Sequence, residues 1–114
     1  MGLQIEIRQA DNITILDLHG RATIGLANDL LNARLRQVVD GGARKILINL
    51  TTTSQIDSSG ISTLVRTFVT LSRNGGSLKI FGPNGRVREV LEVTRLLTSI
   101  PTFKTEAEAL ASYK

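Results

Sequence analysis

The sequence predicts a single α/β domain, in which a mixed sheet of four to five strands packs with about four helices. Two observations predict this class. Short apolar segments of strand length alternate with longer segments in which apolar residues recur every three or four positions. In addition, 114 residues with 41% hydrophobic content suit one ordinary globular domain, and no repeat or linker divides the chain. We therefore expect one domain over residues 1–114.

The first two strands are expected to form an antiparallel hairpin. Apolar and polar residues alternate from Leu3 to Arg8, which predicts a half-buried strand. Asp11-Asn12 is a turn signal, and strand character resumes from Ile13 to Leu18.

A helix is predicted from Ile24 to Val39, followed by a buried strand. The residues expected to face the core from this helix are Ile24, Ala27, Leu31, Leu35 and Val38. Gly41-Gly42 suits the C-terminal end of the helix. The run from Lys45 to Leu50 is nearly all apolar, as expected for a strand covered on both faces.

The second predicted helix runs from Ser58 to about Asn74 and ends at the glycine pair that follows. Its expected buried stripe is Ile61, Leu64, Val65, Phe68 and Leu71.

The C-terminal third continues the alternation of strands and helices. Ser77 to Phe81 is predicted to be a strand, and Arg86 to Thr94 a helix. The residues expected to face inward from this helix are Val87, Val90 and Leu91. A short edge strand is predicted over Ser99 to Thr102, and Thr105 with Glu108 has the spacing of a capping box for a last helix.

Composition excludes several functions. The chain has no cysteine and one histidine, which leaves no disulfide framework and few ligands for a transition metal. No apolar run approaches the ~18 residues of a membrane span, and the N-terminus does not resemble a signal peptide, so a cytoplasmic protein is expected. The net charge of +4 is spread along the chain and aromatic residues are 4%, which argues against nucleic-acid binding. No phosphate-binding or other cofactor motif is present.

The candidate functional site lies where a loop becomes a helix, over Ile56 to Ile61. Asp57 or Ser58 is expected to cap the helix, and simple capping is the plain structural interpretation. Gly60 is unfavourable inside a helix by about 1 kcal/mol relative to alanine, which makes sense where another group approaches closely. An exposed polar stripe suited to a partner is predicted to follow: Ser58, Ser62, Arg66, Thr70 and Arg73.

A serine hydrolase is the remote alternative. Ser58 or Ser59 would need His19, the single histidine, as its base, and no G-x-S-x-G elbow surrounds either serine. A structural histidine at the end of a strand is the simpler interpretation of His19.

The motif Asp57-Ser58-Ser59-Gly60, preceded by Ile48-Asn49-Leu50, resembles the strand–loop–helix of the STAS-domain anti-sigma factor antagonists, with their D-S-[ST]-G signature. The resemblance extends over nearly the whole chain in the order of elements, including Asn74 to Ile80. It implies a STAS-like fold and no enzymatic activity.

The resemblance also implies a role in bacterial transcription regulation by partner switching, typically in stress responses. The unphosphorylated protein would bind an anti-sigma factor that is also a serine kinase, and so free its sigma factor. Phosphorylation at Ser58 would block this binding, and a separate phosphoserine phosphatase would restore it. The residues expected to contact a partner are Asp57, Ser58, Ser59, Gly60, Ser62, Thr63, Arg66, Arg21 and Thr23.

One segment departs from the family pattern. Members commonly carry acidic residues in a G-[ED]-[LI]-D segment after the second strand, whereas this chain has Gly20-Arg21-Ala22-Thr23. Altered partner choice is the expected consequence, with Arg21 available to an acidic partner or to phosphoserine. The alternative function is a non-catalytic STAS scaffold subunit of a transport or stress-signalling complex, in which the same motif would be a docking surface.

Overall fold

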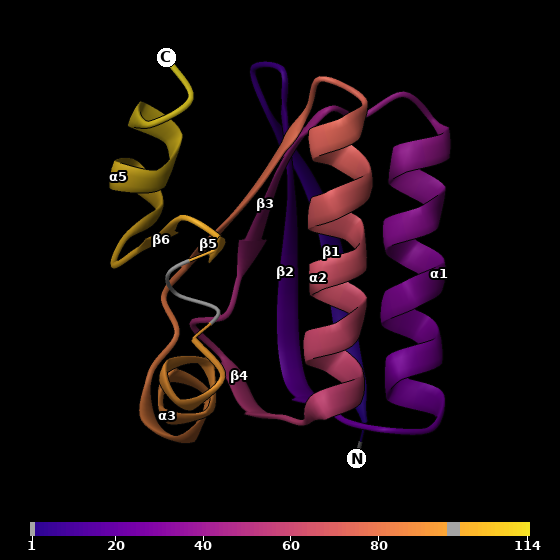
Figure 1. Ribbon diagram of the computed structural model, residues 1–114, viewed down its shortest axis with the longest axis vertical. Coiled ribbons are helices and arrows are strands. Elements are labelled where there is room, and N and C mark those ends of the chain that lie inside the picture. The colour runs from indigo at the N-terminus through magenta and orange to yellow at the C-terminus, as the bar shows by residue number, and fades with distance from the viewer. Residues whose placement is uncertain (1, 96–98) are drawn as a thin grey trace.

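Helices cover both faces of a mixed sheet in the computed structural model, which describes residues 2–95 and 99–114 (Figure 1). The strands described are β1 (Leu3–Ala10), β2 (Ile13–Ala22), β3 (Lys45–Asn49), β4 (Thr53–Ile56), β5 (Ser77–Phe81) and β6 (Thr102–Phe103). The helices described are α1 (Leu26–Asp40), α2 (Ser58–Arg73), α3 (Gly85–Val93) and α5 (Glu106–Ala111). The predicted α/β class is confirmed.

The sheet has six strands among the described residues, rather than the four to five predicted. Its order is β1-β2-β3-β5-β6, with β4 pairing with β2; only β1 and β2 are antiparallel. The prediction missed β4 because Thr53-Ser54-Gln55-Ile56 is short and polar. This strand forms because β2 is ten residues long. The first half of β2 pairs with β3, and the second half of β2 is left to pair with β4.

Two predicted boundaries are corrected. The edge strand β6 begins at Thr102 rather than at Ser99, and Pro101, which has no amide hydrogen, contributes only its carbonyl to Ile80 N (2.9 Å). Helix α1 begins at Leu26, because its N-cap Gly25 has φ of +103°, a backbone conformation outside the right-handed helical region. Ile24 therefore lies before the helix and is 81% exposed, which contradicts its predicted place in the core.

The main core lies between one face of the sheet and the helices α1, α2 and α3. Leu31 and Leu35 of α1 are buried there, as are Leu64 and Leu71 of α2, as predicted. In Figure 1 the helices α1 and α2 run side by side across the sheet, and both begin at the same end of the molecule. This arrangement places the start of α2 beside the turn that leads into α1.

The opposite face of the sheet carries α5 over a smaller apolar cluster and a polar network. Thr105 caps α5 by accepting a hydrogen bond from Glu108 N (3.2 Å), as predicted. Asp17, only 7% exposed, accepts hydrogen bonds from Arg8 Nε (2.6 Å) and Asn49 Nδ2 (2.8 Å). Desolvation raises the pKa of Asp17, but the hydrogen bonds from Arg8 and Asn49 outweigh it and hold the pKa below its usual value.

We expect this network to make the fold sensitive to acid. Because the pKa of Asp17 is lower in the folded than in the unfolded protein, its stabilisation is present above the ordinary pKa of 3.8 and is lost as pH falls through the folded value. The free energy of unfolding should therefore decrease over that range. Urea titrations at a series of pH values should show a shallower decrease for Asp17→Asn than for Asp40→Asn, an exposed control. Equal slopes in the two variants would contradict this assignment.

Candidate functional site

The start of α2 is fixed by the carboxylate of Asp57. Its Oδ1 accepts hydrogen bonds from the amides of Ser59 (3.0 Å) and Gly60 (3.2 Å), which are otherwise unsatisfied in the first turn of a helix. Its Oδ2 accepts a hydrogen bond from Ile24 N (2.8 Å), in the turn between β2 and α1. Of the two predicted capping residues, Asp57 is therefore the N-cap, and it also ties two elements together.

The carboxylate of Asp57 is held in its charged form. Desolvation raises its pKa, but the hydrogen bonds from Ser59, Ile24 and Gly60 together outweigh this effect and lower the pKa below its usual value. A negative charge is thus fixed directly beside Ser58.

We expect Asp57→Ala to lower the free energy of unfolding by about 1–2 kcal/mol, the usual cost of losing an N-cap side chain. Asp57→Asn should lose less, because the amide oxygen still accepts hydrogen bonds. Equilibrium urea unfolding measures both, and a loss in Asp57→Asn as large as that in Asp57→Ala would contradict the capping role.

The two serines of the motif have different surroundings. Ser58 is exposed, and its hydroxyl makes no hydrogen bond to any residue that the structure describes. Ser59 is half-buried, and its Oγ donates a hydrogen bond to Asp57 Oδ1 (2.5 Å). An enzyme approaching from solvent therefore meets the hydroxyl of Ser58 first.

Gly60 and Thr63, two of the predicted partner contacts, lie beneath the surface of the domain. A Cβ atom on Gly60 would lie 2.6 Å from the carbonyl oxygen of Ala22, so the glycine permits the close approach expected from its position. Thr63 is fully buried, and its Oγ1 donates to Asn28 Oδ1 (2.9 Å) on α1. Both residues position α2 against its neighbours.

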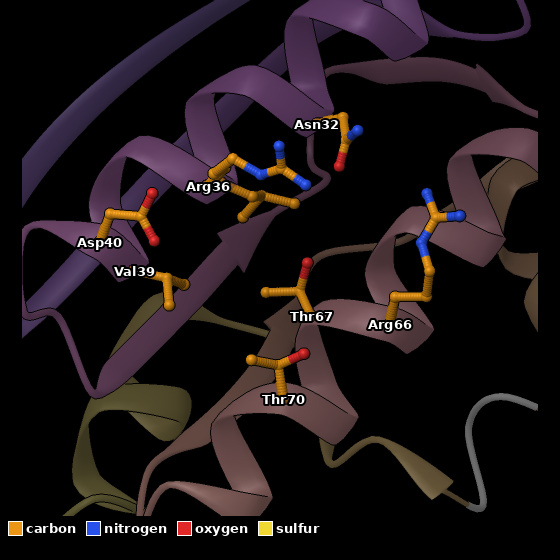
Figure 2. Close-up of a pocket in the computed structure, with 8 residues that line it drawn as sticks. Asn32, Arg36, Val39, Asp40, Arg66, Thr67 and Thr70 are labelled. Carbon is orange, nitrogen blue, oxygen red and sulfur yellow. The ribbon is translucent and has the colours of Figure 1, made fainter.

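The polar stripe along α2 is exposed as predicted, over Ser58, Ser62, Arg66, Thr70 and Arg73. Arg66 also borders a groove of about 250 Å³ between α1 and α2. Figure 2 shows Arg36 and Asp40 on the α1 side of this groove, with Arg66, Thr67 and Thr70 on the α2 side. Two guanidinium groups and one carboxylate thus give the groove a mixed charge, with positive charge in excess.

The segment that departs from the family pattern adjoins the site. The carbonyl of Ala22 accepts a hydrogen bond from Asp57 N (3.3 Å), and Arg21 is paired in register with Gln55 of β4. Arg21 is exposed and Thr23 half-buried. The residues on either side of Ala22 therefore carry a guanidinium and a hydroxyl, where the family pattern has carboxylates.

Two exposed aliphatic residues beside the site were missed by the sequence reasoning. Ile24 lies in the turn before α1 and Leu26 is the first residue of α1, on either side of Gly25, and both are exposed. The helical spacing assigned Ile24 to the core. Gly25 could have indicated that the helix begins after Ile24, because glycine often marks a helix boundary.

His19 is engaged away from the serines. Its Nε2 lies 3.0 Å from Glu6 Oε1 on β1, and its Nδ1 is hydrogen-bonded to the hydroxyl of Thr52. Its ring nitrogens are thus paired with groups on the hairpin and on the loop after β3, rather than with Ser58 or Ser59. Within residues 2–95 and 99–114, no helix is long and apolar enough to cross a bilayer.

Comparison with known proteins agrees with the predicted resemblance. The model of the STAS domain family matches residues 4–109. The anti-sigma-B factor antagonist of Staphylococcus aureus is 29% identical over 96 residues, which cover 84% of this chain and 88% of that protein.

Solved structures share the fold. A candidate anti-sigma factor antagonist from Thermotoga maritima superposes with a TM-score of 0.89 at 24% identity, covering 95% of this chain and 92% of that one. The Bacillus protein SpoIIAA in its phosphorylated form superposes with a TM-score of 0.73 at 22% identity, covering 99% of this chain and 100% of that one. With a family match over almost its whole length, this chain belongs to the STAS domain family.

Proposed function

We propose that this protein is an anti-sigma factor antagonist controlled by phosphorylation of Ser58. In its unphosphorylated form it binds an anti-sigma factor that is also a serine kinase, and the sigma factor is released. Phosphorylation of Ser58 prevents this binding, and a phosphoserine phosphatase restores it. The protein acts in the cytoplasm as a binding module rather than as an enzyme.

The observation that carries this proposal is the contrast between the two serine hydroxyls. Ser58 follows the N-cap directly and presents a free hydroxyl to solvent, whereas Ser59 donates its hydroxyl hydrogen to Asp57. The names of relatives give further support, since one is called an anti-sigma-B factor antagonist and another, SpoIIAA, has been solved in a phosphorylated form.

The physical consequence of phosphorylation fits a switch in binding rather than in folding. A phosphoserine adds about −1.5 to −2 charges at neutral pH. The start of α2 tolerates a negative charge because the helix dipole and the amides of the first turn favour it. A partner docked on this surface would have to desolvate the phosphate together with the charged Asp57, so the complex is disfavoured while the domain stays folded.

Phosphopeptide mapping tests the proposal. The protein is incubated with ATP and each histidine-kinase-like anti-sigma factor of its source bacterium, and modified peptides are identified by mass spectrometry. We expect phosphate on Ser58 in the wild-type protein and in Ser59→Ala, and none in Ser58→Ala. Phosphate on Ser59, or no modification by any of these kinases while they phosphorylate their own known substrates, would overturn the proposal.

A further inference from the structure

Two large aliphatic side chains are exposed to solvent at the start of α1, where the backbone is bonded to Asp57. Ile24 is 81% exposed and Leu26 is 88% exposed. Among the described residues, the other exposed large hydrophobic side chains are Ile7, Val69 and Val93. Of these five residues, Ile24 and Leu26 are the two that lie close together in the sequence, and the turn that holds Ile24 is bonded to Asp57.

The turn and the first residue of α1, which carry this apolar pair, are held in place by hydrogen bonds. Asp57 Oδ2 accepts from Ile24 N (2.8 Å), and the carbonyls of Thr23 and Gly25 accept from Asn28 N (3.1 Å) and from Asp29 N (3.0 Å). Because the backbone is fixed before any partner arrives, little conformational freedom is lost when the two side chains are buried. Burying exposed apolar side chains such as these against a partner favours association.

The same carboxylate connects the apolar pair to the serine. One oxygen of Asp57 holds Ile24, and the other caps the helix that begins with Ser58. Figure 1 shows α1 and α2 beginning at the same end of the molecule, so a partner seated there covers both starts.

We propose, on the basis of the function proposed above, that Ile24 and Leu26 are apolar anchors that insert into an apolar pocket of the anti-sigma factor. A second copy of this chain fits the surface less well, because each copy carries a net charge of +4 and the two would repel. The anti-sigma factor is the partner whose binding must also cover Ser58, and the backbone of Ile24 is bonded to Asp57, the residue directly before that serine.

This placement explains how a single phosphate can have a large effect. Burying the pair removes water from the end of the molecule that also carries Ser58. A neutral hydroxyl tolerates this loss of water at small cost, whereas a phosphate next to the charged Asp57 does not. The apolar anchors would thus supply affinity for the unphosphorylated form and, by excluding water, strengthen the discrimination against the phosphorylated form.

Binding measurements on serine variants test this inference. The dissociation constant for the anti-sigma factor that binds the wild-type protein is measured by isothermal titration calorimetry for Ile24→Ser, Leu26→Ser, the double variant and Val93→Ser. Val93 is 82% exposed on α3 and serves as the matched control. We expect each single variant at the turn to bind about 10- to 100-fold more weakly and the double variant at least about 100-fold more weakly, the effect of losing one or two buried aliphatic side chains. Val93→Ser should bind within about twofold of wild type.

The outcomes separate this inference from the proposed function. If the double variant binds within about threefold of wild type while Ser58→Asp does not bind, the anchor assignment is wrong and the switch stands. If the wild-type protein binds no anti-sigma factor of its bacterium, the proposed function fails and the inference fails with it. Analytical ultracentrifugation adds a third outcome: self-association of the wild-type protein that is lost in the double variant would assign the pair to a homodimer instead.

Discussion

Replacing Ser58 with Asp is expected to weaken binding to the anti-sigma factor by at least about a hundredfold. Like charges and desolvated carboxylates cost several kcal/mol at an interface, and about 1.4 kcal/mol corresponds to a factor of ten in affinity. The new carboxylate would lie beside Asp57, whose pKa is already lowered by hydrogen bonds from Ser59, Ile24 and Gly60 despite desolvation. Neither charge can be relieved by protonation at neutral pH. Titration calorimetry with the purified anti-sigma factor measures the effect directly.

Two controls accompany this variant. Ser58→Ala removes the hydroxyl without adding charge and should bind within about threefold of wild type. Ser72→Asp adds the same charge at an exposed position near the other end of α2 and should also bind normally. The melting temperature of Ser58→Asp should stay close to that of the wild type, since a helix N-terminus accommodates a carboxylate. Wild-type affinity in Ser58→Asp would remove the basis for the switch.

Replacing Gly60 with Ala is expected to lower the free energy of unfolding by about 1–3 kcal/mol, the usual effect of forcing an extra carbon into a packed site. Helix propensity alone predicts the opposite, because alanine is favoured over glycine inside a helix by about 1 kcal/mol. Packing should dominate here, since the new Cβ would lie 2.6 Å from the carbonyl oxygen of Ala22 and 2.9 Å from Cγ1 of Ile56. The carbonyl oxygen of Ala22 belongs to the backbone of a paired strand, so relieving this contact requires a shift of β2 or of α2.

Urea unfolding of Gly60→Ala and Ser62→Ala separates the two effects. Ser62 is exposed on the same helix two residues later, so alanine there should leave stability unchanged or raise it slightly. A Gly60→Ala protein that is as stable as Ser62→Ala would show that the contact with Ala22 relaxes without cost. We also expect Gly60→Ala to weaken partner binding, because Asp57 N is bonded to the same carbonyl of Ala22.

The elements that could be predicted from the sequence are those whose own periodicity determines them. The predicted α2 stripe faces the core, with Leu64 and Leu71 buried and Ile61, Val65 and Phe68 partly buried. The β1–β2 hairpin follows from the alternation of Leu3 to Arg8 and the turn signal Asp11-Asn12. These patterns are local, so no knowledge of the remaining chain is needed to interpret them.

The elements that could not be predicted depend on distant neighbours. Strand β4 is polar and four residues long, and it exists because β2 extends beyond β3 and leaves a free edge. The hydroxyl of the buried Thr63 donates a hydrogen bond to Asn28 on another helix. The residues around position 63 in the sequence do not indicate this contact. Ile24 fits the helical spacing, but the conformation of Gly25 starts α1 after it.

The candidate site shows the same division. The sequence located a helix cap and two serines, because capping residues have a strong local preference. It left open which residue caps the helix and which serine is free. The structure resolves both, since Asp57 Oδ1 occupies the first-turn amides and also binds the hydroxyl of Ser59. The second role of Asp57, as a partner of Ile24, connects residues 33 positions apart and has no counterpart in local sequence.

The central claim is that phosphate on Ser58 decides whether the anti-sigma factor binds. The most direct test compares one preparation of the protein before and after homogeneous phosphorylation at Ser58, by titration calorimetry with the same anti-sigma factor held in its nucleotide-bound form. We predict tight binding by the unmodified protein, an affinity at least about a hundredfold lower after phosphorylation, and full recovery after phosphatase treatment. Equal affinities before and after phosphorylation would contradict the account.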